Sequence, residues 1–111
     1  MQVKECYAAM GGDYEGVMSR LLSEERVKKY LLKFLNDRSF DTLQTAMAEA
    51  DREEAFRMAH TLKGVSQNLG FTSLFVSSDA LTEALRNEMR VDAGALFCKV
   101  EADYRATVAA I

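Results

Sequence analysis

Apolar residues recur along most of the chain at spacings of three and four, which is the period of an amphipathic helix. No segment of alternating apolar and polar residues competes with this pattern. The chain also lacks proline, the residue that most strongly disrupts a helix. The sequence therefore predicts an all-α fold, with helices over about 13–21, 24–36, 40–50, 52–69, 73–89 and 93–111.

Polar residues stand where the predicted helices begin. Asp13, Ser23 and Ser39 precede the first three, and each can accept a hydrogen bond from a free backbone N–H of the first turn. Asp51 and Glu54 have the spacing of a capping box before the fourth helix, over 52–69, and Gly70 follows that helix as a typical C-terminal glycine. The boundaries of the fourth helix are therefore the best defined.

The connections between the predicted helices are short and polar. Such connections place successive helices antiparallel. We expect an up-and-down antiparallel four-helix bundle over residues 39–111, with additional N-terminal helices over 13–36. A length of 111 residues suits a single domain, 1–111, whose core needs neither metal nor disulfides.

The fourth helix has two faces of different composition. At 100° per residue, the apolar face collects Ala55, Met58, Ala59, Leu62, Val65 and Leu69. The other face collects Glu53, Phe56, Arg57, His60, Lys63, Gly64 and Gln67. His60 is the only histidine of the chain, and it is expected to face solvent. On periodicity alone, a lone histidine is more often a structural or surface residue than a functional one.

The neighbours of His60 change that balance. Gly64 lies one turn beyond, and a glycine inside a helix costs about 1 kcal/mol relative to alanine. Either access of another molecule to the imidazole or a tight helix crossing would explain why a glycine stands at position 64. Lys63, alone an ordinary surface lysine, can swing its ammonium toward a phosphoryl group on His60, and Gln67 can donate a hydrogen bond to it.

Phe56 is a large apolar side chain on this otherwise polar face, with Arg57 beside it. An exposed aromatic residue needs cover from another element or from a partner. Two explanations remain open for Phe56: a docking contact, which would include Arg57, or cover by the N-terminal helices.

The segment AHTLKGVSQNLG, residues 59–70, resembles the signature of the histidine phosphotransfer (HPt) family. The similarity extends from about Asp13 to the sixth helix. It implies that His60 is phosphorylated, that Lys63 helps to hold the phosphoryl group and that Gly64 gives receiver domains access. Gln67 departs from the small residue of many members, and Thr82 stands where some carry a glutamine that orients the imidazole.

The resemblance implies a phosphorelay intermediate, which accepts a phosphoryl group from a receiver-domain aspartyl phosphate and transfers it to another receiver. The implied partners are response-regulator receiver domains and a hybrid sensor histidine kinase. Mg²⁺ is expected from the receiver, with no cofactor or metal bound by this chain. Neither a Walker motif nor a kinase glycine-rich loop is present, so we expect a phosphoryl carrier without ATP-dependent kinase activity.

Charge and composition limit the kinds of partner and the cellular location that the sequence allows. The net charge of −3 leaves no basic face for nucleic acid, so a protein partner is favoured. The sequence has neither a signal segment nor an apolar run of about 18 residues that would indicate a membrane span. We therefore expect a cytoplasmic protein, and we expect it to be a monomer. Cys6 and Cys98 lie far apart in sequence and are interpreted as reduced thiols.

Several other functions were weighed against phosphotransfer. A non-phosphorylated HPt-like module could dock receiver or kinase domains. The dimerisation hairpin of a sensor kinase usually has an acidic residue after its histidine and a proline soon beyond, whereas Thr61 follows His60 and proline is absent. A metal site needs several converging ligands, and the chain has one histidine. For Cys–His catalysis, the sequence predicts no arrangement that would bring Cys6 or Cys98 to His60.

Overall fold

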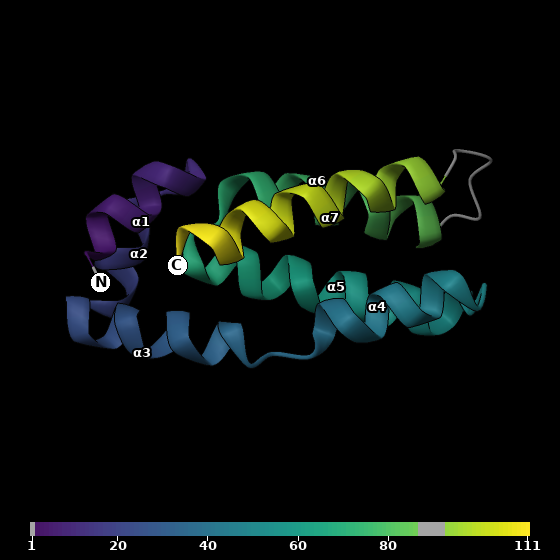
Figure 1. The fold of residues 1–111 in the computed structure, drawn as a ribbon, viewed down its shortest axis with the longest axis horizontal. Coiled ribbons are helices and arrows are strands. Elements are labelled where there is room, and N and C mark those ends of the chain that lie inside the picture. Colours follow the sequence, from purple (N-terminus) through teal and green to yellow (C-terminus); the bar gives the residue numbers. More distant parts are fainter. Residues whose placement is uncertain (1, 87–92) are drawn as a thin grey trace.

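A computed structural model describes residues 2–86 and 93–111. Within these residues the chain forms seven helices in an elongated body of 41 × 21 × 20 Å (Figure 1). They are α1 (Val3–Met10), α2 (Tyr14–Leu21), α3 (Glu24–Leu35), α4 (Ser39–Ala48), α5 (Arg52–Leu69), α6 (Thr72–Arg86) and α7 (Ala93–Ala110). The all-α prediction is confirmed.

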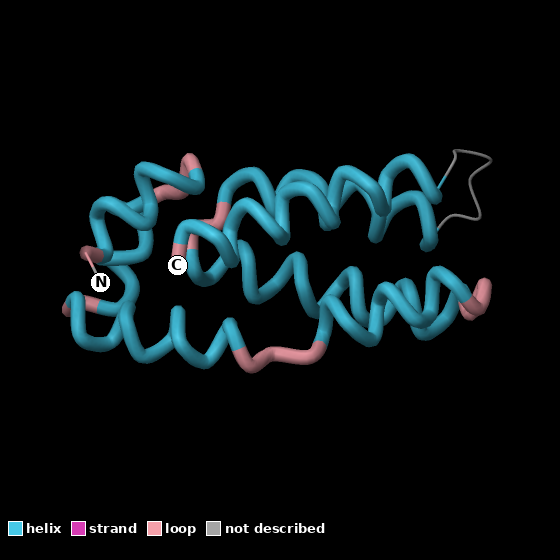
Figure 2. Tube along the Cα trace, viewed as in Figure 1, coloured by secondary structure: helices cyan, strands magenta, loops and turns pink. Residues whose placement is uncertain are grey.

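Helices α4 to α7 form the expected up-and-down four-helix bundle. Each of α4/α5, α5/α6 and α6/α7 packs along its length, and α7 also meets α4, which closes the ring. Figure 2 shows the α4–α5 and α5–α6 connections at opposite ends of α5, as an antiparallel arrangement requires. Helix α3 leads into α4 along one side, and α1 and α2 cover the end of the bundle where the C-terminus lies (Figure 1).

The core combines aliphatic side chains on α5 and α6 with an aromatic cluster near the N-terminal helices. Ala55, Ala59 and Leu62 of α5 are almost completely buried, as their periodicity predicts. Phe34 of α3 meets Phe71, in the α5–α6 turn, with ring centroids 4.9 Å apart. A fully buried side chain of the size of leucine or phenylalanine contributes about 1.5–3 kcal/mol. These contacts fix α5 in the bundle, so that its polar face points outward.

Helix α1 was not predicted, and its absence from the predicted elements is an error. Val3, Cys6, Tyr7 and Met10 are buried on one face of this eight-residue helix. A helix this short is unstable by itself, and Gln2 supplies no side-chain cap. Contacts with α2, α3 and α7 stabilise it, together with the hydrogen bond from Tyr7 to the Leu69 carbonyl of α5, and those contacts are invisible in a local pattern.

The helix caps were predicted correctly in three of four places. Asp13, Ser23 and Asp51 accept hydrogen bonds from the first turns of α2, α3 and α5. Ser39 is not a cap, because it is the first residue of α4 and donates its backbone N–H to the Asp37 carboxylate at 2.7 Å. Asp37 therefore performs the capping role.

The reciprocal half of the predicted capping box is missing. The Glu54 carboxylate pairs with Arg57 instead of the backbone N–H of Asp51, which donates to the carbonyl of Ala46 at 2.9 Å. Asp51 thus caps α5 alone.

The helix boundaries differ from prediction by a few residues. Helix α3 ends at Leu35, one residue early. Helix α4 stops at Ala48 instead of residue 50, and Ala50 takes a left-handed backbone conformation with φ 55° that cannot continue a helix. Residues 87–89 of the fifth predicted helix lie outside the described residues. Among the described residues, no helix is long and apolar enough to cross a membrane.

Candidate functional site

The polar face of α5 carries an exposed imidazole. His60 is exposed, as predicted, and no hydrogen bond or ion pair joins it to any residue that the structure describes. Its ring lies beside that of Phe56, with centroids 6.1 Å apart and planes 17° apart. With Glu53, Glu54 and Arg57, these two rings line an open hollow of about 420 Å³. The imidazole is therefore accessible to a partner.

Phe56 is half-buried, and the side chain that covers its ring comes from α6, which neither of the two predicted explanations named. The Arg86 guanidinium of α6 lies over the ring, 5.3 Å from its centroid, so cover by the N-terminal helices was a wrong prediction. A cation above an aromatic ring is attracted by its electron density. The docking explanation stays a prediction. The exposed Arg57 side chain pairs with Glu54 within α5.

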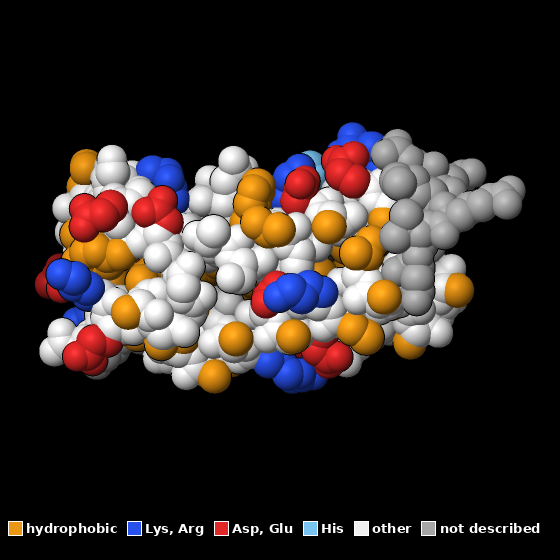
Figure 3. Space-filling view, turned by 90° about the horizontal axis from the view of Figure 1, so that it is seen from above, with side chains coloured by type: hydrophobic (Ala, Val, Ile, Leu, Met, Phe, Trp, Pro, Cys, Tyr) orange, Lys and Arg blue, Asp and Glu red, His pale blue; other side chains and the backbone are white. Residues whose placement is uncertain are grey.

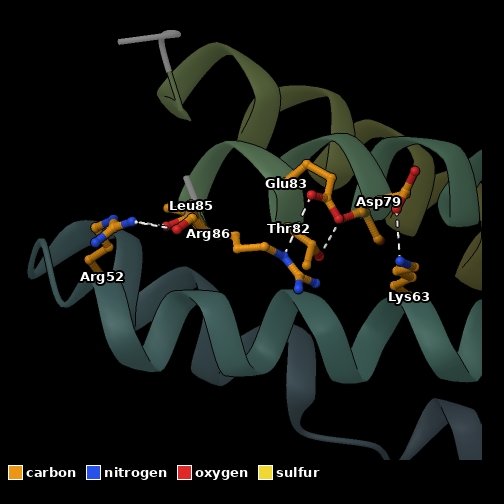
Figure 4. A network of polar contacts seen from close by, with 8 residues as sticks. Arg52, Lys63, Asp79, Thr82, Glu83, Leu85 and Arg86 are labelled. Carbon is orange, nitrogen blue, oxygen red and sulfur yellow. Dashed lines mark hydrogen bonds and ion pairs between the residues drawn. The ribbon is translucent and has the colours of Figure 1, made fainter. Parts of the chain in front are cut away.

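Lys63 is held by a residue of the neighbouring helix. Its ammonium lies 2.9 Å from the Asp79 carboxylate of α6 (Figure 4). The Lys63 side chain is only 24% exposed, so it lies against α6 instead of extending freely into solvent. A cation is thus fixed about one turn from His60, where it could meet a negative group on the imidazole.

Gly64 faces open space. A Cβ atom added to this glycine would meet nothing within 4 Å. A tight helix crossing therefore does not explain the glycine. The other explanation, access for an outside molecule, stays a prediction.

Gln67 is exposed near the C-terminal end of α5, two turns from His60. The last carbonyl groups of this helix are satisfied by the N-terminal part of the chain. The donors are Tyr7 Oη to Leu69 at 2.6 Å, Asp13 N to Gly70 at 2.8 Å, Arg20 Nε to Asn68 at 3.0 Å and Arg20 Nη2 to Gln67 at 3.1 Å. Helix C-termini otherwise leave these carbonyls without intrahelical partners. The N-terminal helices therefore fix the end of α5.

The Hpt domain family model matches residues 32–110, which include all of α4 to α7. That match covers more than half of the chain. The chain belongs to the Hpt family. Hpt domains are phosphoryl carriers that take part in histidine phosphotransfer in phosphorelays, and they interact with receiver domains and kinases. Searches of curated proteins and of solved structures returned no match.

The family match leaves α1, α2 and most of α3 of this Hpt domain outside it. Yet Tyr7 of α1, Asp13 at the start of α2 and Arg20 of α2 are the residues that donate hydrogen bonds to the end of α5. The histidine helix of this Hpt domain thus depends on a region beyond the matched residues for the capping of its C-terminus.

Thr82 of this Hpt domain does not replace the glutamine that orients the imidazole in some members. Antiparallel packing brings Lys63 to Asp79 and Phe56 to Arg86, so His60 lies level with Thr82. Thr82 is fully buried, and its hydroxyl donates to the Ser78 carbonyl at 2.7 Å (Figure 4). The hydroxyl is therefore directed to its own helix.

Asp79 and Arg86 were missed at the sequence level. The signal was available, because α5 and α6 are joined at a short turn around Phe71 and residues equally far from that turn lie opposite one another. Lys63 and Asp79 satisfy that condition, as do Phe56 and Arg86.

Figure 3, which looks onto the α6–α7 side of the Hpt domain, shows acidic and basic side chains intermingled there.

Proposed function

We propose that this chain is a phosphorelay intermediate in which His60 accepts a phosphoryl group from a receiver-domain aspartyl phosphate and passes it to another receiver. The observation that carries the proposal is the exposed imidazole of the only histidine, within the family match and free of intramolecular hydrogen bonds to the described residues. An imidazole in that setting can be approached in line by a partner's phosphoryl group.

The transfer exchanges one bond to phosphorus for another. The lone pair of an imidazole nitrogen forms the P–N bond while the P–O bond to the aspartyl carboxylate breaks, and the carboxylate leaves with the electron pair. A second receiver reverses these changes with its own aspartate. Such reactions require mainly positioning and charge stabilisation, for which the Lys63 ammonium is suited.

Gly64 and the hollow beside Phe56 would serve docking. The open space above Gly64 lets a receiver approach one side of the imidazole, and Phe56 with Arg57 offers an apolar and a cationic contact on the other. Gln67, further along the same face, is placed to meet the receiver or a phosphoryl oxygen. We assign these four residues, with His60 and Lys63, to the functional face.

The divalent ion of the reaction would come from the receiver. Mg²⁺ needs several free oxygen ligands. The carboxylates of Glu54, Asp79 and Glu83 are each paired with a cation, and Glu53, which also lines the hollow beside His60, is a single carboxylate. We also propose that the chain acts as a monomer, receives its phosphoryl group through a hybrid sensor kinase and has no ATP-dependent kinase activity. Light scattering and incubation with labelled ATP test the first and the last of these statements.

The decisive experiment follows phosphoryl transfer from phosphorylated receivers to the purified chain on a phosphate-retarding gel. Wild type is expected to become labelled, His60→Gln is expected to remain unlabelled, and the label should be lost in acid, as a phosphohistidine requires. Binding to receivers without transfer, across a panel of them, would instead favour a non-phosphorylated docking module.

A further inference from the structure

The cation expected to meet the phosphoryl group already has an anionic partner. Lys63 Nζ lies 2.9 Å from Asp79 Oδ1, and the two side chains are 24% and 43% exposed (Figure 4). The partnership joins two helices, because Lys63 belongs to α5 and Asp79 to α6. Packing within the four-helix bundle holds these two helices against each other, so the Asp79 carboxylate has a defined position beside Lys63.

A phosphoryl group on His60 would have to compete with that carboxylate. The Lys63 ammonium can neutralise the phosphoryl oxygens fully only if it gives up part of its contact with Asp79. The carboxylate would also repel the negatively charged phosphoryl group directly. Both effects have the same sign, since each makes the phosphorylated state less favourable than it would be without Asp79.

We propose that Asp79 is a positioning residue that holds Lys63 beside His60 and, by competing for its ammonium, lowers the stability of the phosphohistidine. This inference rests on the proposed function. A carrier must release the group that it accepts, and an anion that weakens the bound state favours release. Asp79 would therefore set how much of the phosphoryl group stays on His60 when the chain exchanges with a receiver.

Asp79→Asn removes the charge and keeps the shape of the side chain. Partly exposed ion pairs have modest energies, so we expect the equilibrium ratio of phosphorylated chain to phosphorylated receiver to rise about two- to fivefold. Asp79→Glu keeps the charge and should return the ratio toward wild type. An unchanged ratio in Asp79→Asn would overturn the proposal.

Glu83→Gln is the matched control. Glu83 is also on α6 near the level of His60, but its carboxylate pairs with Arg86 at 3.5 Å (Figure 4). The two substitutions remove the same charge from the same helix, and only one of them releases Lys63. Equal effects of both would show a general change of electrostatic field and would contradict the positioning role.

A double-mutant cycle tests whether Asp79 acts through Lys63. In a Lys63→Gln background there is no ammonium to hold, so Asp79→Asn should then change the exchange ratio much less than in wild type. A full-sized effect in that background would mean that Asp79 acts on the phosphoryl group directly, and the positioning role would be wrong.

A measurement without a receiver separates this inference from the proposed function. Phosphoramidate can phosphorylate the full chain chemically: the imidazole nitrogen bonds to phosphorus, the original P–N bond breaks, and ammonia leaves. The ³¹P resonance of His60 is then titrated with pH. Asp79→Asn should lower the midpoint of the last phosphoryl ionisation, because a freed ammonium favours the dianion.

Failure of the proposed function and failure of the role of Asp79 would give different results. If no receiver exchanges with wild type, the proposed function fails, while the ³¹P titration can still support the competition between Asp79 and the phosphoryl group. If receivers exchange normally but wild type, Asp79→Asn and Glu83→Gln share one ³¹P midpoint, the role of Asp79 is overturned and the proposed function stands.

Discussion

The Tyr7 hydroxyl donates a 2.6 Å hydrogen bond to the carbonyl oxygen of Leu69, across 62 residues of sequence. Tyr7 is 1% exposed, and Leu69 is the last residue of α5. The bond therefore connects a helix outside the family match to the end of the helix that carries His60. It makes the N-terminal region part of the structural support of the candidate site.

Tyr7→Phe should destabilise the fold by about 1–2 kcal/mol, because it leaves the buried Leu69 carbonyl without this donor while the packing of the ring is preserved. Urea unfolding measures the change. Tyr14→Phe is the matched control, since the Tyr14 hydroxyl bonds to the Glu24 carboxylate at an exposed site and its loss should have a small effect. Equal losses in the two variants would contradict the structural importance assigned to Tyr7.

Stability should also fall in alkali. Burial raises the pKa of Tyr7 in the folded chain above its ordinary value of 10.0. Below pH 10 the hydroxyl keeps its proton in both states, so its contribution is complete. Above pH 10 the unfolded chain loses the proton first, binds fewer protons than the folded chain and becomes relatively more stable.

The free energy of unfolding is therefore expected to decrease as the pH rises above about 10, and to decrease less in Tyr7→Phe. Some decrease should remain in that variant, because burial and the nearby carboxylates of Asp41 and Asp37 also raise the pKa of Tyr104. Parallel curves for wild type and Tyr7→Phe would show that Tyr7 does not contribute to the alkaline loss.

Gly64 inside α5 and Gly70 directly after its end should respond to alanine in opposite directions. Gly64→Ala should stabilise the fold by about 0.5–1 kcal/mol, because the added methyl group meets no atom and alanine favours helix. Gly70→Ala should destabilise it by about 1–3 kcal/mol, because Gly70 has φ 72° and its Cβ would lie 2.8 Å from the Asp13 carbonyl oxygen. Thermal unfolding of the two variants compares them directly.

The same position tests access to the imidazole. Gly64→Gln should retain the fold and slow phosphoryl exchange with a receiver by about tenfold or more, because the long side chain would disturb the approach to His60. Thr61→Gln is the control, since Thr61 is exposed on α5 and lies beside the docking face. A Gly64→Gln variant with wild-type exchange would remove Gly64 from the functional face.

Phe56→Ala should weaken receiver binding about tenfold, since a central aromatic contact is worth about 1–2 kcal/mol or more at protein interfaces. Transfer at saturating receiver should change much less. Val76→Ala is a suitable control, because Val76 is 61% exposed on α6 but lines a different hollow, with Lys99 and Asp103. Isothermal titration or fluorescence binding distinguishes a Phe56-specific loss from a general surface effect.

The sequence by itself determined the features that depend on neighbouring residues along the chain. The apolar periodicity predicted the four bundle helices, Asp51 and Gly70 predicted the ends of α5, and the same helix geometry predicted an exposed His60. These predictions succeeded because periodicity, capping and helix termination depend on residues within a few positions of each other.

Only the tertiary structure decided which distant residues complete the site. Asp79 holds Lys63, Arg86 covers Phe56, and Tyr7 on an unpredicted helix bonds to the end of α5. Each of these contacts joins two helices, so it depends on their register and on which face of the bundle each helix covers. The short turn at Phe71 limits the register of α5 against α6, but a local pattern does not show which faces of the helices meet, because the burial that fixes those faces is shared by the whole core.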